Sequence, residues 1–313
     1  LERGYSTDSL EERNLTSRHG QDYPRLANRI PVRNSGLRLG LAYTNSRYQL
    51  GKEFSSLDAY GQAKVWTVSA NYPLIRSRRA NLFTEVSYDR KSLDDHIGTS
   101  ATSNEKHNNI LALGLSGNRY ETAGGSTTFS VRIESGSLEI DTPSAKIVDD
   151  LTAKTSGPYT KYGYSVSRNQ PLTAKTLLFL SLSGQRASKN LDSAEKMSLG
   201  GPFGVRAYPV GEATGDDGLL ATAEMRYELG QKKLPGKLNL IGFFDTGKIT
   251  INHIPYAAGE NNRKLSGTGI GMTLIKPRDF DARLSYARKN GSSPNVSDAE
   301  KSTQTWLLFS KVF

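Results

Sequence analysis

The sequence predicts an all-β fold, a transmembrane antiparallel β-barrel with a long loop folded into its lumen. Segments of about ten residues alternate apolar with small or polar side chains, which is the period-two pattern of strands. The connections between these segments alternate short and long, as the two ends of an outer-membrane barrel do. No apolar run approaches the roughly 20 residues of a membrane helix. The mean hydropathy of −0.53 suits strands that expose only every second residue to lipid.

About thirteen strands can be assigned in chain order. Residues 1–21 are polar and irregular, so no strand can be assigned there, and we expect an irregular or truncated N-terminal segment before a barrel domain at 22–313. The predicted strands of the first group are 23–32, 37–44, 66–72, 82–89, 111–116, 129–134, 162–167 and 178–183. The predicted strands after a long connection are 219–227, 238–248, 265–274, 280–288 and 303–313.

The two faces of these strands differ too strongly for a soluble β-sandwich. One face carries charged residues such as Glu85, Arg132 and Glu224, which are too polar for a sandwich core. The other face is rich in leucine, tyrosine and tryptophan, like a lipid-facing band with aromatic girdles. Single-chain bacterial barrels have even strand numbers, so we expect N-terminal strands that are missing or unrecognised. The last strand ends in Phe313, which we interpret as a C-terminal assembly signal.

The longest connection lies between the two groups of strands. Its central stretch, 198–218, holds six glycines and two prolines, so it cannot be regular sheet. With its flanks it far exceeds the roughly 12–15 residues usual for a structureless loop. Phe203, Val205, Tyr208 and Val210 need something to pack on. We therefore predict an ordered hairpin inserted into the barrel, with Arg206 at its tip.

A predicted partner for Arg206 lies on the polar face of a later strand. Alternation places Asp245 on that face, and Gly267, Gly269 and Gly271 form a bare stripe on the next strand because residues two apart share a face. Glycine lets another backbone approach closely, so the loop could lie on the stripe while Arg206 pairs with Asp245. At ~4 Å and an effective dielectric near 20, such a pair is worth about 4 kcal/mol before desolvation. The alternative is a solvated Arg206 and a locally paired Asp245, and the residues alone leave both open.

Other chemistry finds little support. The chain has no cysteine, which excludes disulfides and thiolate chemistry. The four histidines, at 19, 96, 107 and 253, show neither metal-ligand spacing nor a Ser/His/Asp arrangement, so we expect no enzyme activity, metal or cofactor. The net charge of +10 is spread along the chain without a nucleic-acid motif, so we expect no nucleic-acid partner.

Four segments resemble one known family. The run 199–213 is similar to the long-loop motif of two-partner-secretion transporters, the TpsB family of haemolysin and adhesin secretion/activation proteins in the BamA-like superfamily. Phe243-x-Asp-x-Gly247 resembles the family's paired barrel-wall motif, and 72–80 and 188–193 also resemble it. The resemblance covers roughly residues 22–313. The contact-dependent-inhibition transporters (CdiB) are one possible subgroup.

The resemblance implies a Gram-negative outer-membrane pore of sixteen strands, preceded by a plug helix and two periplasmic polypeptide-transport-associated domains. Such a pore exports a large unfolded exoprotein (haemolysin, adhesin or contact-dependent-inhibition toxin) to the cell surface without ATP. We expect this partner, outer-membrane lipid and the barrel assembly machinery as contacts, and a monomer. A passive porin and a BamA-like barrel insertase remain the alternatives.

The resemblance also implies roles for single residues. The lumen loop motif comprises Gly204, Val205, Arg206, Ala207, Tyr208 and Pro209, and the wall motif comprises Phe243, Asp245 and Gly247. We recognise no plug helix or periplasmic domains in these residues and about three strands fewer than the family has, so we expect the sequence to be a fragment that comprises the barrel. Ala207 also stands where the family usually has glycine, which questions the tightness of the loop tip and leaves the charge pair unaffected.

Overall fold

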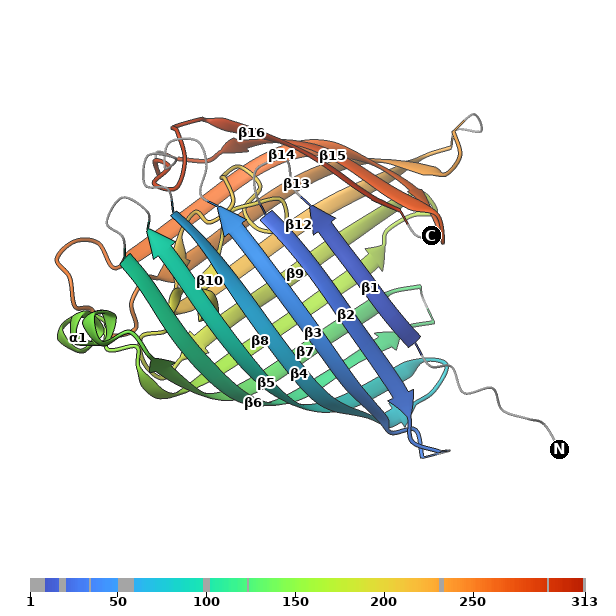
Figure 1. The fold of residues 1–313 in the computed structure, drawn as a ribbon. Coiled ribbons are helices and arrows are strands. Elements are labelled where there is room, and N and C mark those ends of the chain that lie inside the picture. Colours follow the sequence, from blue (N-terminus) through green and yellow to red (C-terminus); the bar gives the residue numbers. More distant parts are fainter. Residues whose placement is uncertain are drawn as a thin grey trace. The chain divides into compact units, whose positions relative to one another are not determined.

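The chain is built almost entirely of antiparallel strands (Figure 1). The computed structural model describes residues 9–16, 21–33, 35–49, 59–97, 102–122, 124–230, 234–291 and 293–311. In the described part, fourteen strands follow one another in the hydrogen-bonding order β1 to β9 and then β12 to β16, and a separate two-stranded pair is formed by β10 and β11. The pairs from β1 to β5 and from β9 through β12 to β16 are antiparallel.

The first strands are β1 (Ser9–Thr16), β2 (Gln21–Pro31), β3 (Arg38–Gln49), β4 (Ala59–Arg76), β5 (Ala80–Ile97), β6 (Thr102–Tyr120) and β7 (Ser126–Ile140). After helix α1 (Pro143–Leu151) come β8 (Gly157–Pro171) and β9 (Thr176–Ala187). A short 3₁₀ turn (Ser193–Glu195) leads to β10 (Met197–Ser198) and β11 (Thr214–Gly215). The last strands are β12 (Asp217–Leu229), β13 (Lys237–Thr250), β14 (Asn262–Lys276), β15 (Phe280–Lys289) and β16 (Thr303–Lys311).

Each of the thirteen strands predicted from the sequence is present, and most are longer than predicted. Residues 1–21, where no strand could be assigned from the sequence, contain β1, which pairs with β2 over its whole length. Its sequence, SLEERNLT, lacks the apolar alternation by which the other strands were found. The helix α1 and the β10–β11 pair were also missed, because both lie in connections where no periodic pattern was expected.

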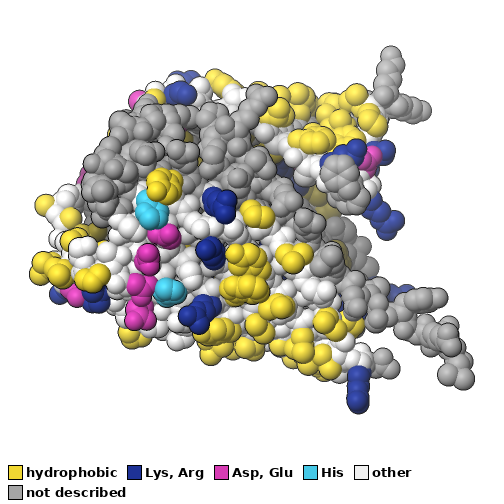
Figure 2. All heavy atoms as spheres, in the orientation of Figure 1, with side chains coloured by type: hydrophobic (Ala, Val, Ile, Leu, Met, Phe, Trp, Pro, Cys, Tyr) yellow, Lys and Arg dark blue, Asp and Glu magenta, His cyan; other side chains and the backbone are white. Residues whose placement is uncertain are grey.

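The chain forms two compact units, and each is described by itself. The first unit comprises Leu1–Gly117, Val131–Tyr162 and Ser188–Asp192. One face of its sheet is apolar and exposed, and yellow side chains in the middle of Figure 2 belong to this face. Trp66 and Val68 of β4 are 53% and 56% exposed there. The intervening residues form the opposite, polar face, where Arg132 is paired with Glu134 at 2.7 Å.

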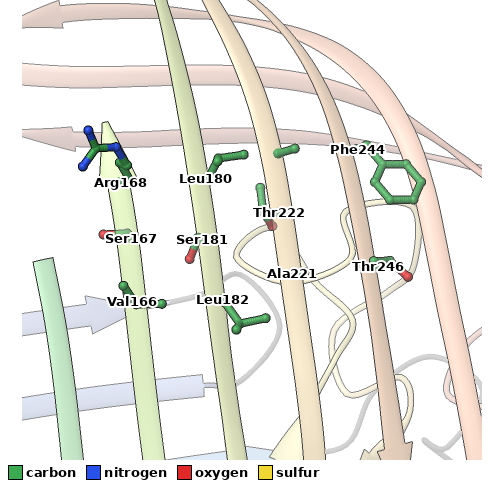
Figure 3. Close-up of a pocket in the computed structure, with 11 residues that line it drawn as sticks. Val166, Ser167, Arg168, Leu180, Ser181, Leu182, Ala221, Thr222, Phe244 and Thr246 are labelled. Carbon is green, nitrogen blue, oxygen red and sulfur yellow. The ribbon is translucent and has the colours of Figure 1, made fainter. Parts of the chain in front are cut away.

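The second unit comprises Asn118–Ser130, Gly163–Ala187 and Ser193–Phe313. The long connection between β10 and β11 packs on the polar face of its strands. The buried core here combines loop and strand residues: Leu199, Val205, Ala207, Tyr208, Ala213, Ile241, Phe243, Ile249, Leu265 and Ala287. The opposite face is apolar, and it is hollowed by about 300 Å³ at Ala221 and Ala223, between Leu180, Leu182 and Phe244 (Figure 3).

No helix in the described ranges is long and apolar enough to cross a membrane.

The alternation of faces makes a direct prediction for β4. Val68 lies on the apolar face, which the sequence assigns to lipid, and Thr67 lies on the polar face. A lysine at position 68 would place a charge in hydrocarbon, so Val68→Lys should destabilise the folded chain by about 2–4 kcal/mol. Thr67→Lys is the matched control, and it should lower the free energy of unfolding by much less. Urea unfolding in lipid vesicles measures both, and equal losses would contradict the assignment of the faces.

Candidate functional site

The loop between β10 and β11 is ordered by its own hydrogen bonds. The Leu199 amide donates to the Ala213 carbonyl at 3.2 Å, and the Val205 amide donates to the Leu199 carbonyl at 2.7 Å. Gly204 lies so close to Leu199 that an added Cβ would collide with the Leu199 carbonyl oxygen. Glycine at this position therefore allows two backbone segments of the loop to pack directly against each other. The loop is compact, and its buried residues include Gly204, Val205, Ala207, Tyr208 and Pro209.

Arg206 is held by Asp245 of β13 through a bidentate ion pair. Its Nε donates to Asp245 Oδ2 and its Nη2 donates to Asp245 Oδ1, each at 2.8 Å. The backbone amide of Arg206 also donates to Oδ2, at 3.2 Å. Thr222 of β12, which faces Asp245 across the β12–β13 ladder, donates its hydroxyl to Oδ1 at 2.9 Å. Both Asp245 oxygens thus receive at least two donors.

Three further groups surround the Arg206 guanidinium and backbone. Its Nη1 donates to Glu224 Oε2 at 2.8 Å, and its Cζ lies 3.4 Å from the centre of the Phe243 ring. The Arg206 carbonyl accepts a hydrogen bond of 2.7 Å from the Trp306 indole of β16. Arg226 donates to the other Glu224 oxygen at 2.6 Å, so neither oxygen of that carboxylate lacks a cation.

This cluster is almost completely withdrawn from solvent. The side chains of Arg206, Glu224 and Asp245 are 4%, 2% and 0% exposed. Buried charges carry a large desolvation cost, which only good geometry and full pairing offset. Removing one partner leaves an uncompensated charge and typically costs about 3–5 kcal/mol. The alternative of a solvated Arg206 with a locally paired Asp245 does not describe this arrangement.

The glycine stripe is only partly covered by the loop. A Cβ added to Gly267 would collide with the Cβ of Ala207, so that position must stay bare for the loop to pack. Gly269 lies under the Phe243 ring of the neighbouring strand, and Gly271 packs against β15 at the Leu284 carbonyl. On β13, Gly247 gives room to the Leu199 side chain. The loop therefore meets the stripe at Gly267, and residues of neighbouring strands cover Gly269 and Gly271.

One loop expectation needs correction. Phe203 and Val210 were expected to pack inside, but they are 82% and 66% exposed. Arg206, predicted at the tip of the inserted hairpin, lies between the buried residues Val205 and Ala207, against the strands. The apolar residues that anchor the loop are Leu199, Val205 and Tyr208. Phe313 lies outside the described residues.

A second anchor was missed by sequence reasoning. Glu212 is completely buried, and its carboxylate accepts hydrogen bonds from the amides of Val296 and Ser297, at 3.0 and 2.9 Å. Arg263 of β14 also donates to it. Glu212 therefore fastens the loop to the connection between β15 and β16. The local sequence could not predict this role of Glu212, because its partners Arg263 and Ser297 lie about fifty and eighty-five residues further along the chain.

Glu224 and Trp306 were also missed as site residues, though a signal for Glu224 existed. Alternation placed it on the polar face of β12, and register places it beside Phe243. A third anchor is Asp216, which pairs with Lys196 at 3.1 Å and accepts from the His253 amide at 2.8 Å. Among the described residues, no group of three or more His, Asp or Glu side chains is arranged to hold a metal ion.

Loop docking can be measured by thiol labelling, because the chain has no cysteine of its own. Val205→Cys places a thiol at a position with 0% exposure, so a maleimide should label it slowly. Adding Asp245→Ala leaves Arg206 with one carboxylate, and labelling should accelerate at least about tenfold, because each 1.4 kcal/mol corresponds to a factor of ten. Val210→Cys, already exposed, is the control and should react equally fast in both backgrounds. An unchanged rate at position 205 would refute anchoring by Asp245.

The Glu212 anchor should respond to acid. Burial alone would raise the pKa of Glu212, but the Ser297 and Val296 hydrogen bonds and the Arg263 charge outweigh it and hold the pKa below its ordinary value. The stabilisation is therefore present above the unfolded pKa and is lost as pH falls below about 4.3. Glu212→Gln should lower the thermal midpoint at pH 7, and its difference from wild type should shrink in acid.

Glu300→Gln is the matched control for that experiment, since Glu300 lies in the same connection but pairs with Lys289 at the surface, with a side chain 58% exposed. It should change the midpoint little at neutral pH. If the difference in thermal midpoint between Glu212→Gln and wild type did not change with pH, the loop would not be anchored by an ionised Glu212.

Comparison with known proteins places this geometry in a family. The model of the haemolysin secretion/activation proteins ShlB/FhaC/HecB matches residues 5–274. The heme/hemopexin transporter protein HuxB of Haemophilus influenzae is 30% identical over 284 residues, which cover 88% of this chain and 49% of the relative. The outer membrane transporter CdiB of Dickeya dadantii (strain 3937) is 24% identical over 243 residues, 75% of this chain and 42% of the relative. The chain spans about half the length of the curated relatives it matches.

Solved structures show the same fold. CdiB from Escherichia coli superposes with a TM-score of 0.76 at 14% identity, covering 93% of this chain and 53% of that one. BamA from Haemophilus ducreyi, lacking POTRA domains 1–3, gives a TM-score of 0.67 at 14% identity, covering 97% and 64%. The relatives matched by sequence are named as transporters rather than enzymes. This chain therefore belongs to the haemolysin secretion/activation protein family ShlB/FhaC/HecB, the TpsB family, and its place is the outer membrane of a Gram-negative bacterium.

Proposed function

We propose that this chain forms the pore of an exporter that carries a large unfolded exoprotein from the periplasm to the cell surface without ATP. The observation that carries the proposal is the buried Arg206 cluster, which fastens a long loop to the polar face of the strands. In an outer-membrane barrel the polar face lines the lumen. Family membership and relatives named for transport support the same function, with a haemolysin, adhesin or contact-dependent-inhibition toxin as the exported class.

The strength of the docking suits a loop that must be held in place and still be movable. Freeing Arg206 removes it from two carboxylates, and breaking buried pairs costs several kcal/mol. At about 1.4 kcal/mol per factor of ten, a docked loop would outnumber a free one by roughly a hundredfold or more. Differential binding of a transported chain to the free state could supply an energy of that size. The loop is thus proposed as part of the export mechanism.

The lining of the polar face suits an unfolded polypeptide. In the first unit, Glu134 pairs with both Arg132 and Lys161, at 2.7 and 2.9 Å. In the second unit, Glu224 pairs with both Arg206 and Arg226. Charges that are satisfied within the wall keep it hydrophilic without offering strong binding to every passing side chain. A passing chain would therefore meet a polar surface with little apolar area to adhere to.

The alternatives make different demands. A passive porin would use the same loop as a constriction and would pass small solutes without exporting protein. A barrel insertase would be needed for viability, which an exporter is not. The likeness to BamA concerns the fold, so it does not favour insertase activity. We also propose that the chain acts as a monomer and is assembled by the barrel assembly machinery, with Phe313 as the recognised end.

Export tests the proposal directly. In cells that produce the full-length protein and the neighbouring large exoprotein, Arg206→Ala should reduce the exoprotein in the medium at least about tenfold, because a buried pair is lost. Arg186→Ala, an exposed arginine of β9, is the control and should export normally. If a correctly folded wild type exports nothing while small ions pass, the porin alternative is favoured.

A charge swap tests the pairing within that assay. Arg206→Asp with Asp245→Arg exchanges the two partners, but the new aspartate would face Glu224. We therefore expect clear recovery only when Glu224→Gln is added, because that change removes the like charge. Without recovery in the triple variant, direct pairing would not be what export requires.

A further inference from the structure

Six arginines gather at the short-turn end of β2–β5, in the first unit. They are Arg29, Arg33, Arg38, Arg76, Arg78 and Arg79. Register places Arg29 opposite Gly40, and Arg38 opposite both Pro31 and Asn71. The turn between β2 and β3 touches the end of β4, since a Cβ added to Gly36 would lie 3.1 Å from the Pro73 ring. Residues from two neighbouring turns and three strands therefore form one group, which we call the arginine cluster.

The arginine cluster has no internal counter-charge of matching size. Among the described residues, none of its six arginines forms an ion pair. The nearby carboxylate Glu85 is already 3.4 Å from Arg132, an arginine further along the polar face. Arg132 itself shows the contrast, since it is paired with Glu134 and lies 3.5 Å from Asp89. Arg132 and Lys161 of the same unit are thus neutralised by carboxylates of the wall, whereas no such pair is found for the cluster in the part of the chain that the structure describes.

Two of these arginines line a hollow of about 250 Å³. Its lining consists of Arg29, Arg38, Gly40, Ser69, Asn71, Phe83, Glu85 and Ser116. The Arg29 side chain lies across Gly40, where a Cβ would stand 3.6 Å from Arg29 Cγ and 2.6 Å from Ser69 Oγ. A side chain at position 40 would therefore take up space beside Arg29 and Ser69 in the lining of the hollow. A hollow of this size and polarity fits side chains that carry a carboxylate.

The hollow opens on the polar face and away from lipid. On β3, the residues flanking Gly40 are Leu39 and Leu41, which are 47% and 53% exposed on the apolar face. In an outer-membrane barrel the apolar face contacts lipid, and the short turns lie in the periplasm. The cluster therefore lies where a polypeptide would enter the lumen from the periplasm, and lipid headgroups would have to reach round the strand ends to meet Arg29 and Arg38.

We propose that the arginine cluster binds carboxylate-rich segments of the polypeptide that enters the pore. This proposal rests on the proposed function, because it assigns a chemistry to the exported chain. Guanidinium groups pair with carboxylates through two parallel hydrogen bonds, and exposed pairs are weak and screened by salt. Binding would be multivalent, reversible and salt-sensitive. It would raise the local concentration of acidic segments at the periplasmic entrance and still allow them to dissociate.

The test uses the whole chain folded in a neutral detergent and a fluorescent oligo-glutamate peptide. Anisotropy should report binding at about 0.05 M salt that is largely lost at about 0.5 M, where the screening length is a few ångströms. Oligo-glutamine and oligo-lysine peptides of the same length should not bind. The double variant Arg29→Ala/Arg38→Ala should bind oligo-glutamate at least about tenfold more weakly. Arg90→Ala, an exposed arginine on the other face of β5, is the matched control and should bind like wild type.

Three results would overturn the proposal. They are absence of binding to wild type, equal binding by the double variant, and displacement of the peptide by a small excess of phosphatidylglycerol in the micelles. The last would assign the arginines to anionic lipid headgroups instead. The comparison of the three peptides on wild type needs no variant, so a folding defect cannot hide the answer. Peptide binding is measured without export, so a pore that exports nothing but binds oligo-glutamate would refute the proposed function alone.

Discussion

The structure around the loop depends on one buried guanidinium shared by two carboxylates. Arg206 comes from the loop, Asp245 from β13 and Glu224 from β12. Burying any one of the three alone would leave a charge without a partner in a site with almost no solvent, and the desolvation cost of that charge would not be offset. The loop must be docked for the carboxylates to be buried, and the carboxylates must be present for the loop to dock.

The surrounding residues follow from this constraint. Phe243 covers the guanidinium face, Trp306 fixes the Arg206 carbonyl, and Gly267 stays bare because Ala207 occupies the space of its Cβ. The loop then needs further anchors at its returning end, and Glu212 and Asp216 supply them through β14 and the connections next to β13 and β15. The positions of the small, aromatic and charged residues around the loop therefore follow from the position of its docked backbone.

How much of this could be predicted differs between strands and contacts. Period-two alternation fixes which face each residue takes, so the strands and the polar positions of Glu224 and Asp245 followed from the sequence. Strand β1 did not, because its residues carry no such alternation and its order comes from pairing with β2. The pairing of Arg206 with Asp245 became a prediction only through a motif resemblance. The Glu212 contacts lie far apart in the chain, and no local pattern encodes them.

The central claim, that Arg206 and Asp245 stabilise the docked loop as a pair, is tested most directly by a double-mutant cycle. Urea unfolding would be measured for wild type, Arg206→Ala, Asp245→Ala and the double variant. The account predicts that the second substitution costs much less in the presence of the first, with a coupling energy of at least about 1 kcal/mol. Free energies that simply add, within about 0.3–0.5 kcal/mol, would mean that the two residues act independently and would contradict it.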